Sequence, residues 1–327
     1  MNAREINRAT LARQLLLGRA RISVPSAVER IGGIQAQDLE APYGALAARV
    51  EGFRRKLLDR AVEQRRVVKA TLMRGTLHIV STRDYAAFVS AILPSLRRQF
   101  ARARLRDAPL EEIEALAAAA TEFAHEPRTT RELREVLGGE DEWFRARFHA
   151  PFVFVPPLAR RRVVAANAWL GDVTVPHEEA LARLAHRYLA AFGPATARDA
   201  ARWAGVSVAT IRAGLERVRT VDLGDGLLDL PRAPRPGNVP APPRLLPAFE
   251  SILLAYDERS RFLTSDAYRH VMLGGIVRQA VLVDGIVAGT WRVERDKVAL
   301  EPFAPLPQRV RRELDAEAAR TAAVLAK

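Results

Sequence analysis

The pattern in residues 177–230 constrains the fold of this chain most strongly. Three stretches with helical periodicity follow one another, at residues 177–192, 197–204 and 208–218. Gly205 forms a tight turn between the last two stretches, and Ser207 is a candidate N-cap. Short apolar segments then flank Gly224-Asp225-Gly226, a strong hairpin signal. This order predicts a helix-turn-helix with an added hairpin, the winged helix.

The same order of elements occurs earlier in the chain. An alanine-rich helix is expected at residues 110–124, a second helix ends at Leu137, and a third carries Trp143 and Phe148. Two strands, 152–155 and 162–165, then flank a Pro-Pro/Arg turn. We interpret this segment as a second winged helix, with Arg160 and Arg161 at the tip of its wing. Winged helices often contact DNA there, although runs of charge are more commonly solvated.

The remaining segments complete a chain that is mainly α with small β. Near the N-terminus we expect helices at 7–19, 26–34 and 57–64, with Gly32 and Gly33 marking a turn, and strands at 67–72 and 76–80. After proline-rich residues 231–247, strands at 252–256, 280–294 and 297–300 and a helix at 308–326 form an antiparallel β domain. The predicted fold is tandem winged-helix modules plus this β domain. Its parts are 1–108, the first winged-helix module; 109–176, the second; 177–232, the third; and 233–327, the C-terminal β domain.

Charge narrows the function of the chain. The net charge is +13 and the pI is about 11.0, with only four lysines, so arginine carries nearly all of the positive charge. Arginine binds phosphate oxygens in pairs, which favours a nucleic-acid partner. A GC-rich genome, or solubility alone, would also explain the bias.

Composition also excludes several chemistries. The chain has no cysteine, which rules out disulfides, iron–sulfur clusters and thiolate zinc sites. The six histidines are scattered and not at metal spacing, so we expect no metal and no cofactor. The N-terminus lacks a signal-peptide core and no apolar run has the length of a membrane span. We therefore expect a cytoplasmic protein.

Gln35-Ala36-Gln37 is the most informative candidate site. Two glutamines flank a small apolar residue in a segment otherwise suited to packing. A glutamine amide both accepts and donates hydrogen bonds, so it can hold a water, but it is not a strong base. Asp38 is either the cap of a following helix or a site carboxylate, and we favour the cap.

Other candidate residues lie on strands and turns. Arg74 and His78 flank a turn near the glutamine segment. Each also has a non-functional interpretation: Arg74 as a solvated surface arginine and His78 as a packed histidine. Arg259 and Arg261 would face the same way on an extended chain and could clamp a phosphate, or could belong to a loop salt-bridge cluster. The candidate DNA contacts are Arg74, Thr76, His78, Arg160, Arg161, Arg259, Arg261 and Arg292.

Four segments together resemble the AlkZ/YcaQ family of winged-helix DNA glycosylases. They are residues 32–43, 72–78, 254–261 and 283–292, in order over nearly the whole chain. The resemblance implies a C-shaped fold around DNA and a catalytic Gln–aliphatic–Gln/Asp motif, which here is Gln35-Ala36-Gln37. Ala36 is smaller than the residue common at the middle position. The resemblance also implies the branch of the family that resembles self-resistance and crosslink-unhooking enzymes.

The chemistry that this motif can support follows from the leaving group. A purine alkylated on a ring nitrogen is cationic and leaves as a neutral base without a general acid, while the sugar gains oxocarbenium character. Our hypothesis is a monofunctional DNA glycosylase in which Gln37 holds the water and Gln35 positions the water or the deoxyribose. The expected partner is double-stranded DNA with alkylated purines, bound by a monomer. The alternatives are a non-enzymatic winged-helix DNA-binding protein, such as a regulator or damage sensor, and a protein-binding scaffold.

Overall fold

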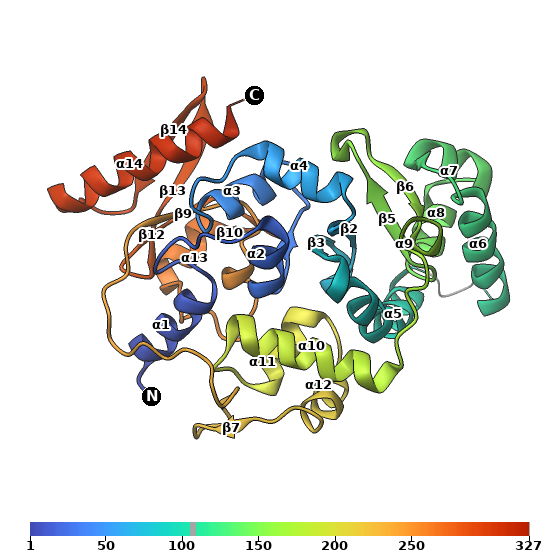
Figure 1. Ribbon diagram of the computed structural model, residues 1–327, viewed down its shortest axis with the longest axis horizontal. Helices are drawn as coiled ribbons and strands as arrows, with labels where there is room; N and C mark the ends of the chain where they lie inside the picture. The colour runs from blue at the N-terminus through green and yellow to red at the C-terminus, as the bar shows by residue number, and fades with distance from the viewer. Residues whose placement is uncertain (105–108, 327) are drawn as a thin grey trace.

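The computed structural model describes residues 1–104 and 109–326, and it is mainly helical with antiparallel sheets (Figure 1). Helices α2, α3 and α4 and strands β2 and β3 lie near the centre of the view, and α1 lies at the lower left. A lobe of α6–α8 lies at the right, and the C-terminal sheet with α14 lies at the upper left. The N-terminal helices are α1 (Ala3–Arg13), α2 (Val24–Arg30), α3 (Ala41–Ala47), α4 (Arg55–Glu63) and α5 (Thr82–Arg104).

A six-stranded sheet joins the centre to the right-hand lobe. Its strand order is β1-β3-β2-β5-β6-β4, and Lys69 on β2 pairs with Phe154 on β5. The expected boundary between the first two modules, residue 108, lies outside the described residues, and the sheet continues across it. The strands are β1 (Ile34–Gln35), β2 (Val67–Thr71), β3 (Leu77–Ser81), β4 (Arg128–Thr129), β5 (Phe152–Val155) and β6 (Arg162–Ala165).

The right-hand lobe has the predicted order of three helices and a hairpin. The Thr129 hydroxyl and the Glu132 carboxylate form a capping box, which fixes the start of α7, and Gly138 in the left-handed region ends it. Short turn η2 (Leu158–Arg160) forms the tip of the β5–β6 hairpin. The helices are α6 (Leu110–Phe123), α7 (Thr130–Leu137), α8 (Glu140–Ala146) and, after the hairpin, α9 (Ala166–Leu170).

Residues 177–230 also have the predicted order of three helices and a hairpin. Thr196 begins α11 with a capping box, Gly205 ends it at φ +75°, and Ser207 caps α12. A short hairpin follows around residues 224–226. The elements are α10 (His177–Phe192), α11 (Ala197–Ala204), α12 (Val208–Leu215), β7 (Val221–Asp222) and β8 (Leu228–Asp229).

The C-terminal part is an antiparallel sheet of order β14-β13-β12-β9, covered by α14. The predicted strand at 252–256 was wrong: the chain forms the short turn η3, because the Glu250 carboxylate accepts from the Ile252 amide and bends the chain. The proline-rich segment supplies an unpredicted strand, β9. The elements are β9 (Arg244–Leu246), η3 (Ser251–Leu253), α13 (Ser265–Val271), β10 (Met272–Leu273), β11 (Ile276–Val277), β12 (Ala280–Val283), β13 (Ile286–Glu294), β14 (Lys297–Pro302) and α14 (Gln308–Leu325).

Buried ion pairs connect these parts. The Arg13 guanidinium binds both carboxylate oxygens of Asp229, at 2.7 and 2.8 Å, and both side chains are buried. Arg49 pairs with Glu250 at 2.8 Å in the same manner. One apolar core extends from Leu11 to Val287. The four expected domains therefore pack together closely, and their division remains a prediction.

Candidate functional site

The Gln35-Ala36-Gln37 segment leaves a glycine turn as the edge strand of the six-stranded sheet. Gly33 has φ +94°, and a Cβ there would lie 2.9 Å from a Val80 methyl carbon, so glycine is required by both conformation and space. The Ala36 amide donates to the Leu77 carbonyl at 2.7 Å, and its methyl group is fully buried. Ala36 thus packs inward, and Gln37, in the bend that follows β1, is exposed at the surface.

Gln35 is nearly buried, with 5% of its surface exposed. Its Oε1 accepts a hydrogen bond of 2.8 Å from Nη2 of Arg74. Because a guanidinium only donates, this bond fixes the orientation of the amide and leaves the Gln35 NH₂ group for another partner.

Gln37 is exposed. The Leu77 backbone amide donates to its Oε1 at 3.3 Å, which steadies the side chain against β3. A carbonyl oxygen has two lone pairs, so Oε1 can still accept from a water while the NH₂ group donates. Gln37 therefore has an acceptor lone pair and an NH₂ group with which it can bind a water.

Arg74 connects the glutamines to the helix-turn-helix. It lies in η1 (Met73–Gly75) with φ +55°, and its Nη1 donates to the Trp203 carbonyl at 2.5 Å. A Cβ on Gly205 would lie 2.7 Å from the Arg74 backbone, so the turn after α11 packs directly against this arginine. Burial, together with the charges of Arg202 and Arg259, lowers the pKa of Arg74 to about 10.

An arginine cluster adjoins Arg74. Arg198 and Arg202, one helical turn apart on α11, both face Asp257 with shortest N–O distances of 3.6 Å. Arg259 follows in the same loop; burial and the charge of Arg202 lower its pKa. The cluster comprises Arg74, Arg198, Arg202 and Arg259, with Asp257 as the carboxylate between two of them. Sequence analysis missed Arg198 and Arg202, although their i, i+4 spacing on a predicted helix was a usable signal.

His78 and Thr76 have structural roles. His78 pairs with Gln35 across the β1–β3 ladder and is 1% exposed, so the prediction that it contacts DNA is corrected. Its Nδ1 lies 3.0 Å from the Thr76 carbonyl oxygen. Burial, assisted by the Arg74 charge, lowers its pKa to about 3 and keeps the ring neutral. The Thr76 hydroxyl donates to the Met73 carbonyl at 3.1 Å and holds the turn.

Arg259 and Arg261 do not form the expected pair, because the loop turns instead of running extended. The Phe262 and Leu263 amides both donate to the Arg259 carbonyl. Arg259 lies toward Arg202, whereas Arg261 stacks on the Tyr256 ring at 3.9 Å and donates to the Thr10 hydroxyl at 3.1 Å. Arg261 is therefore a packing residue in the structure. The prediction that Arg259 and Arg261 together clamp a phosphate is wrong.

The other predicted contacts lie at the β5–β6 hairpin tip and in the C-terminal sheet. Arg160 and Arg161 are exposed at the η2 hairpin tip, as the sequence predicted. Arg292 lies in β13 of the C-terminal sheet, with Glu294 at 2.6 Å and Glu301 beside it. These carboxylates offset its charge, which argues against the predicted DNA contact. Asp38 accepts from the Glu40 and Ala41 amides at 2.8 and 2.9 Å, so its carboxylate holds the turn that leads into α3, whose N-cap position is Glu40.

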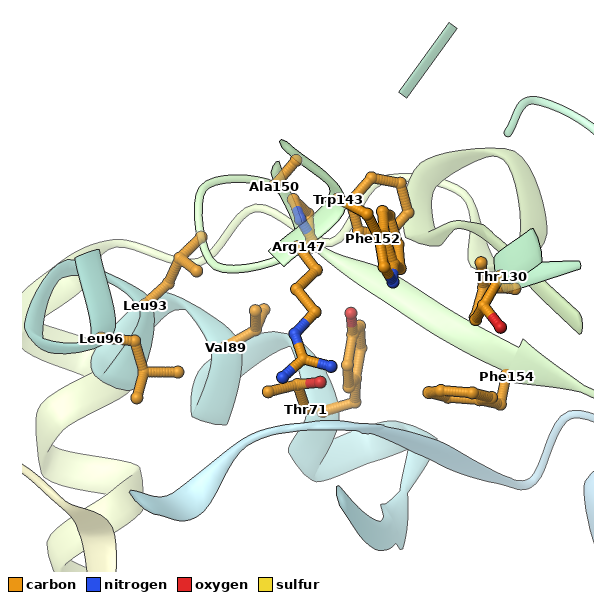
Figure 2. Close-up of a pocket in the computed structure, with 13 residues that line it drawn as sticks. Thr71, Val89, Leu93, Leu96, Thr130, Trp143, Arg147, Ala150, Phe152 and Phe154 are labelled. Atoms are coloured by element: carbon orange, nitrogen blue, oxygen red, sulfur yellow. The ribbon is translucent and has the colours of Figure 1, made fainter. Parts of the chain in front are cut away.

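Figure 2 shows an enclosed pocket between α5, α8 and the sheet, with Arg147 directed toward Thr71. Its volume is about 40 Å³, enough for water but too small for a nucleobase. Among residues 1–104 and 109–326, no group of acidic, histidine or cysteine side chains is arranged to hold a metal ion. Within the same ranges, no helix is long and apolar enough to cross a membrane.

Comparison with known proteins identifies the family to which this chain belongs. Residues 28–324 match the model of the family described as "DNA glycosylase AlkZ-like". The chain belongs to this family. It is 24% identical over 351 residues to an "Interstrand DNA cross-link repair glycosylase" of Streptomyces sahachiroi, covering 95% of this chain and 93% of that protein. The solved structure of the DNA glycosylase AlkZ from the same organism superposes with a TM-score of 0.82 at 21% identity, covering 99% and 96% of the two chains. The structural similarity shows a shared fold.

Proposed function

We propose that this AlkZ-like family member is a monofunctional DNA glycosylase that hydrolyses the N-glycosidic bond of purines alkylated on a ring nitrogen. The observation that carries the proposal is the exposed Gln37 beside the fixed Gln35, next to an arginine cluster. A neutral water-holding pair next to cations suits a reaction whose substrate is an anionic polymer with a cationic leaving group.

The mechanism follows from charge. Alkylation makes the purine cationic, so it departs as a neutral base and needs no general acid. As the C1′–N bond lengthens, positive charge develops on the sugar, as in glycoside hydrolysis. In the proposal, Gln37 Oε1 accepts a hydrogen bond from the attacking water and turns a water lone pair toward C1′. Once the new C1′–O bond has formed, the excess proton of the water passes to solvent. The Gln35 NH₂ group, set by Arg74, donates to the water or to the deoxyribose.

Neutral amides limit the reaction to labile substrates. A carboxylate would stabilise the oxocarbenium more strongly and would activate water more fully than an amide. We therefore expect cleavage of cationic adducts and none of intact purines. The relative's name, which refers to interstrand cross-link repair, supports bulky adducts or crosslinks as substrates here.

DNA binding completes the proposal. The units α6–α8 with β5–β6 and α10–α12 with β7–β8 each have the element order of a winged helix, which supports a tandem winged-helix protein curved around duplex DNA. The proposed binding unit is a monomer. Arg74, Arg202 and Arg259 are the proposed phosphate contacts beside the lesion, and Arg160 and Arg161 are the contacts at the hairpin tip.

The test is incubation with a duplex containing one N7-methylguanine, followed by alkali. The proposal predicts strand scission at the lesion only after alkali, because a monofunctional enzyme leaves an intact abasic strand. A matched duplex with unmodified guanine should stay whole. Binding without abasic product, over N7-methyl and larger N7-alkyl adducts, would instead favour the alternative of a damage sensor.

A further inference from the structure

A second, larger cavity lies between the glutamine segment and the β5–β6 hairpin tip. Its volume is about 500 Å³, which falls in the roughly 300–1,000 Å³ range of small-molecule pockets. Leu39, Tyr43 and Leu58 line one wall, and Ala159 of the hairpin tip lines the other. Figure 1 shows the same relationship, with the tip beside α4.

The cavity begins next to the proposed catalytic motif. Leu39 follows Gln37 by two residues, so their Cα atoms lie within about 7 Å of each other. Asp38, between them, holds the start of the wall by accepting from the Glu40 and Ala41 amides. A group attached to a base near Gln37 therefore has a short path into the cavity.

The lining indicates the chemical class of the occupant. Most of the wall is aliphatic, proline or tyrosine side chain, and Arg55 stacks on the Tyr43 ring at 3.8 Å. Three carboxylates, Glu40, Asp59 and Glu63, accompany only two cations, Arg55 and Lys69. In a protein of net charge +13, the side chains that line this cavity have no positive excess, and the exposed Arg160 and Arg161 of the hairpin tip are not part of the lining. The cavity interior therefore does not suit a backbone phosphate. A neutral aromatic group fits it better.

Lys69 adds a specific hydrogen-bond donor. It is 4% exposed and, in the described part of the chain, its ammonium has no carboxylate partner. The Phe154 ring centre lies 5.7 Å from Nζ, a weak contact. Burial, together with the nearby Arg161 charge, lowers the pKa of Lys69 to about 8. The ammonium nitrogen is not among the fully buried polar atoms that lack a partner, and it lines the cavity. An acceptor on the ligand would therefore replace water at this nitrogen and form a charge-assisted hydrogen bond.

We propose that this cavity, which we call the adduct pocket, receives the aromatic substituent of a bulky alkylated purine, with Lys69 donating to a carbonyl oxygen on that substituent. The inference rests on the proposed glycosylase function and adds its substrate class: N-alkylpurines whose alkyl group carries a carbonyl and an aromatic ring. The purine itself stays at Gln35 and Gln37.

The test uses three duplexes that differ only in the N7 substituent of one guanine: methyl, 2-phenylethyl and 2-oxo-2-phenylethyl. The variants are Ala159→Trp, which fills the pocket from an exposed position; Ala159→Ser, its matched control; and Lys69→Met, which keeps the side-chain length without the charge. Two readouts are taken for each, the equilibrium affinity relative to undamaged duplex and the single-turnover rate of excision. Circular dichroism and thermal melting check that each variant is folded.

We expect Ala159→Trp to lower affinity and excision for both phenyl-bearing duplexes at least tenfold and to leave the methyl duplex within twofold. Lys69→Met should weaken only the carbonyl-bearing duplex, by about tenfold. Equal effects of Ala159→Trp on all three duplexes, or none on any, would overturn the adduct pocket. Equal effects of Lys69→Met on the two phenyl-bearing duplexes would overturn the role of Lys69. If the wild type excises no adduct, the glycosylase proposal fails, while the affinity comparison still tests the pocket.

Discussion

Arg74 donates to the Gln35 side-chain oxygen at 2.8 Å with one guanidinium nitrogen and to the Trp203 carbonyl at 2.5 Å with the other. One side chain thus spans from the edge strand of the sheet to the helix-turn-helix. The position of the Gln35 amide, which is proposed to be catalytic, therefore depends on how α11 packs against Arg74.

Replacement of Arg74 by lysine should slow excision more than it weakens DNA binding. Lysine keeps the charge but cannot reach both oxygens with a planar fork. Loss of one charge-assisted hydrogen bond, about 1.5–3 kcal/mol, corresponds to roughly 10- to 150-fold in single-turnover rate. Affinity for undamaged duplex, measured by fluorescence anisotropy, should change less than about threefold. A wild-type excision rate in Arg74→Lys would show that the link to Gln35 is unimportant.

Replacement of Arg202 by glutamine should reduce the salt dependence of DNA binding. Each phosphate contact contributes about 0.9 to the slope of log K against log salt, so the variant should lose about that amount. Arg309→Gln is the control, because Arg309 is an exposed arginine on α14 with its own carboxylate partner, Glu313. Identical slopes for wild type and Arg202→Gln would remove Arg202 from the DNA interface.

The sequence predicted the elements whose local signals agree with their final environment. The caps at Thr196 and Ser207, with Gly205 between them, specified α11 and α12 to the residue at nearly every end. The segment at 252–256 misled because its apolar run is buried by tertiary packing, while the Glu250 side chain bends the backbone. Burial alone does not distinguish a strand from a turn.

The site was predictable in part. Gln35 and Gln37 stand out as polar residues in an apolar segment, and the structure places Gln37 at the surface. The contact between Arg74 and Trp203 joins residues 129 positions apart, and no local pattern encodes it. No local pattern shows the burial of His78 either. It resembles a site residue in the sequence, but in the structure it is 1% exposed.

Stability should fall with acidification because His78 is buried in its neutral form. Its pKa is lowered to about 3 in the folded chain, against about 6.5 when unfolded, so the unfolded state binds a proton first as the pH falls. The stabilisation is complete above pH 6.5 and is lost progressively from there toward pH 3, by about 1 kcal/mol between pH 6.5 and 5.5. Urea denaturation at these two pH values measures it.

His78→Asn should show a smaller decrease over the same interval. The difference between the variant and the wild type separates His78 from His149 and His186, whose pKa values burial also lowers. Parallel decreases in the two proteins would contradict the assignment to His78.

Asp229→Asn should destabilise the whole chain. Asp229 is fully buried and is held by both outer nitrogens of Arg13, which is itself 1% exposed. Neutralising one partner leaves an uncompensated buried charge, which costs about 3–5 kcal/mol in the free energy of unfolding. Glu135→Gln, which breaks an exposed pair with Arg131, should change it by no more than about 0.5 kcal/mol. Chemical denaturation of both variants decides whether burial sets the difference.

The central claim is that Gln37 holds the attacking water. Its most direct test is the single-turnover rate of N7-methylguanine excision by Gln37→Ala beside its affinity for the same duplex. The account predicts a rate at least about 100-fold below wild type, about 2.7 kcal/mol of lost transition-state stabilisation, with affinity within about threefold. Excision at the wild-type rate by Gln37→Ala, with DNA binding intact, would contradict it.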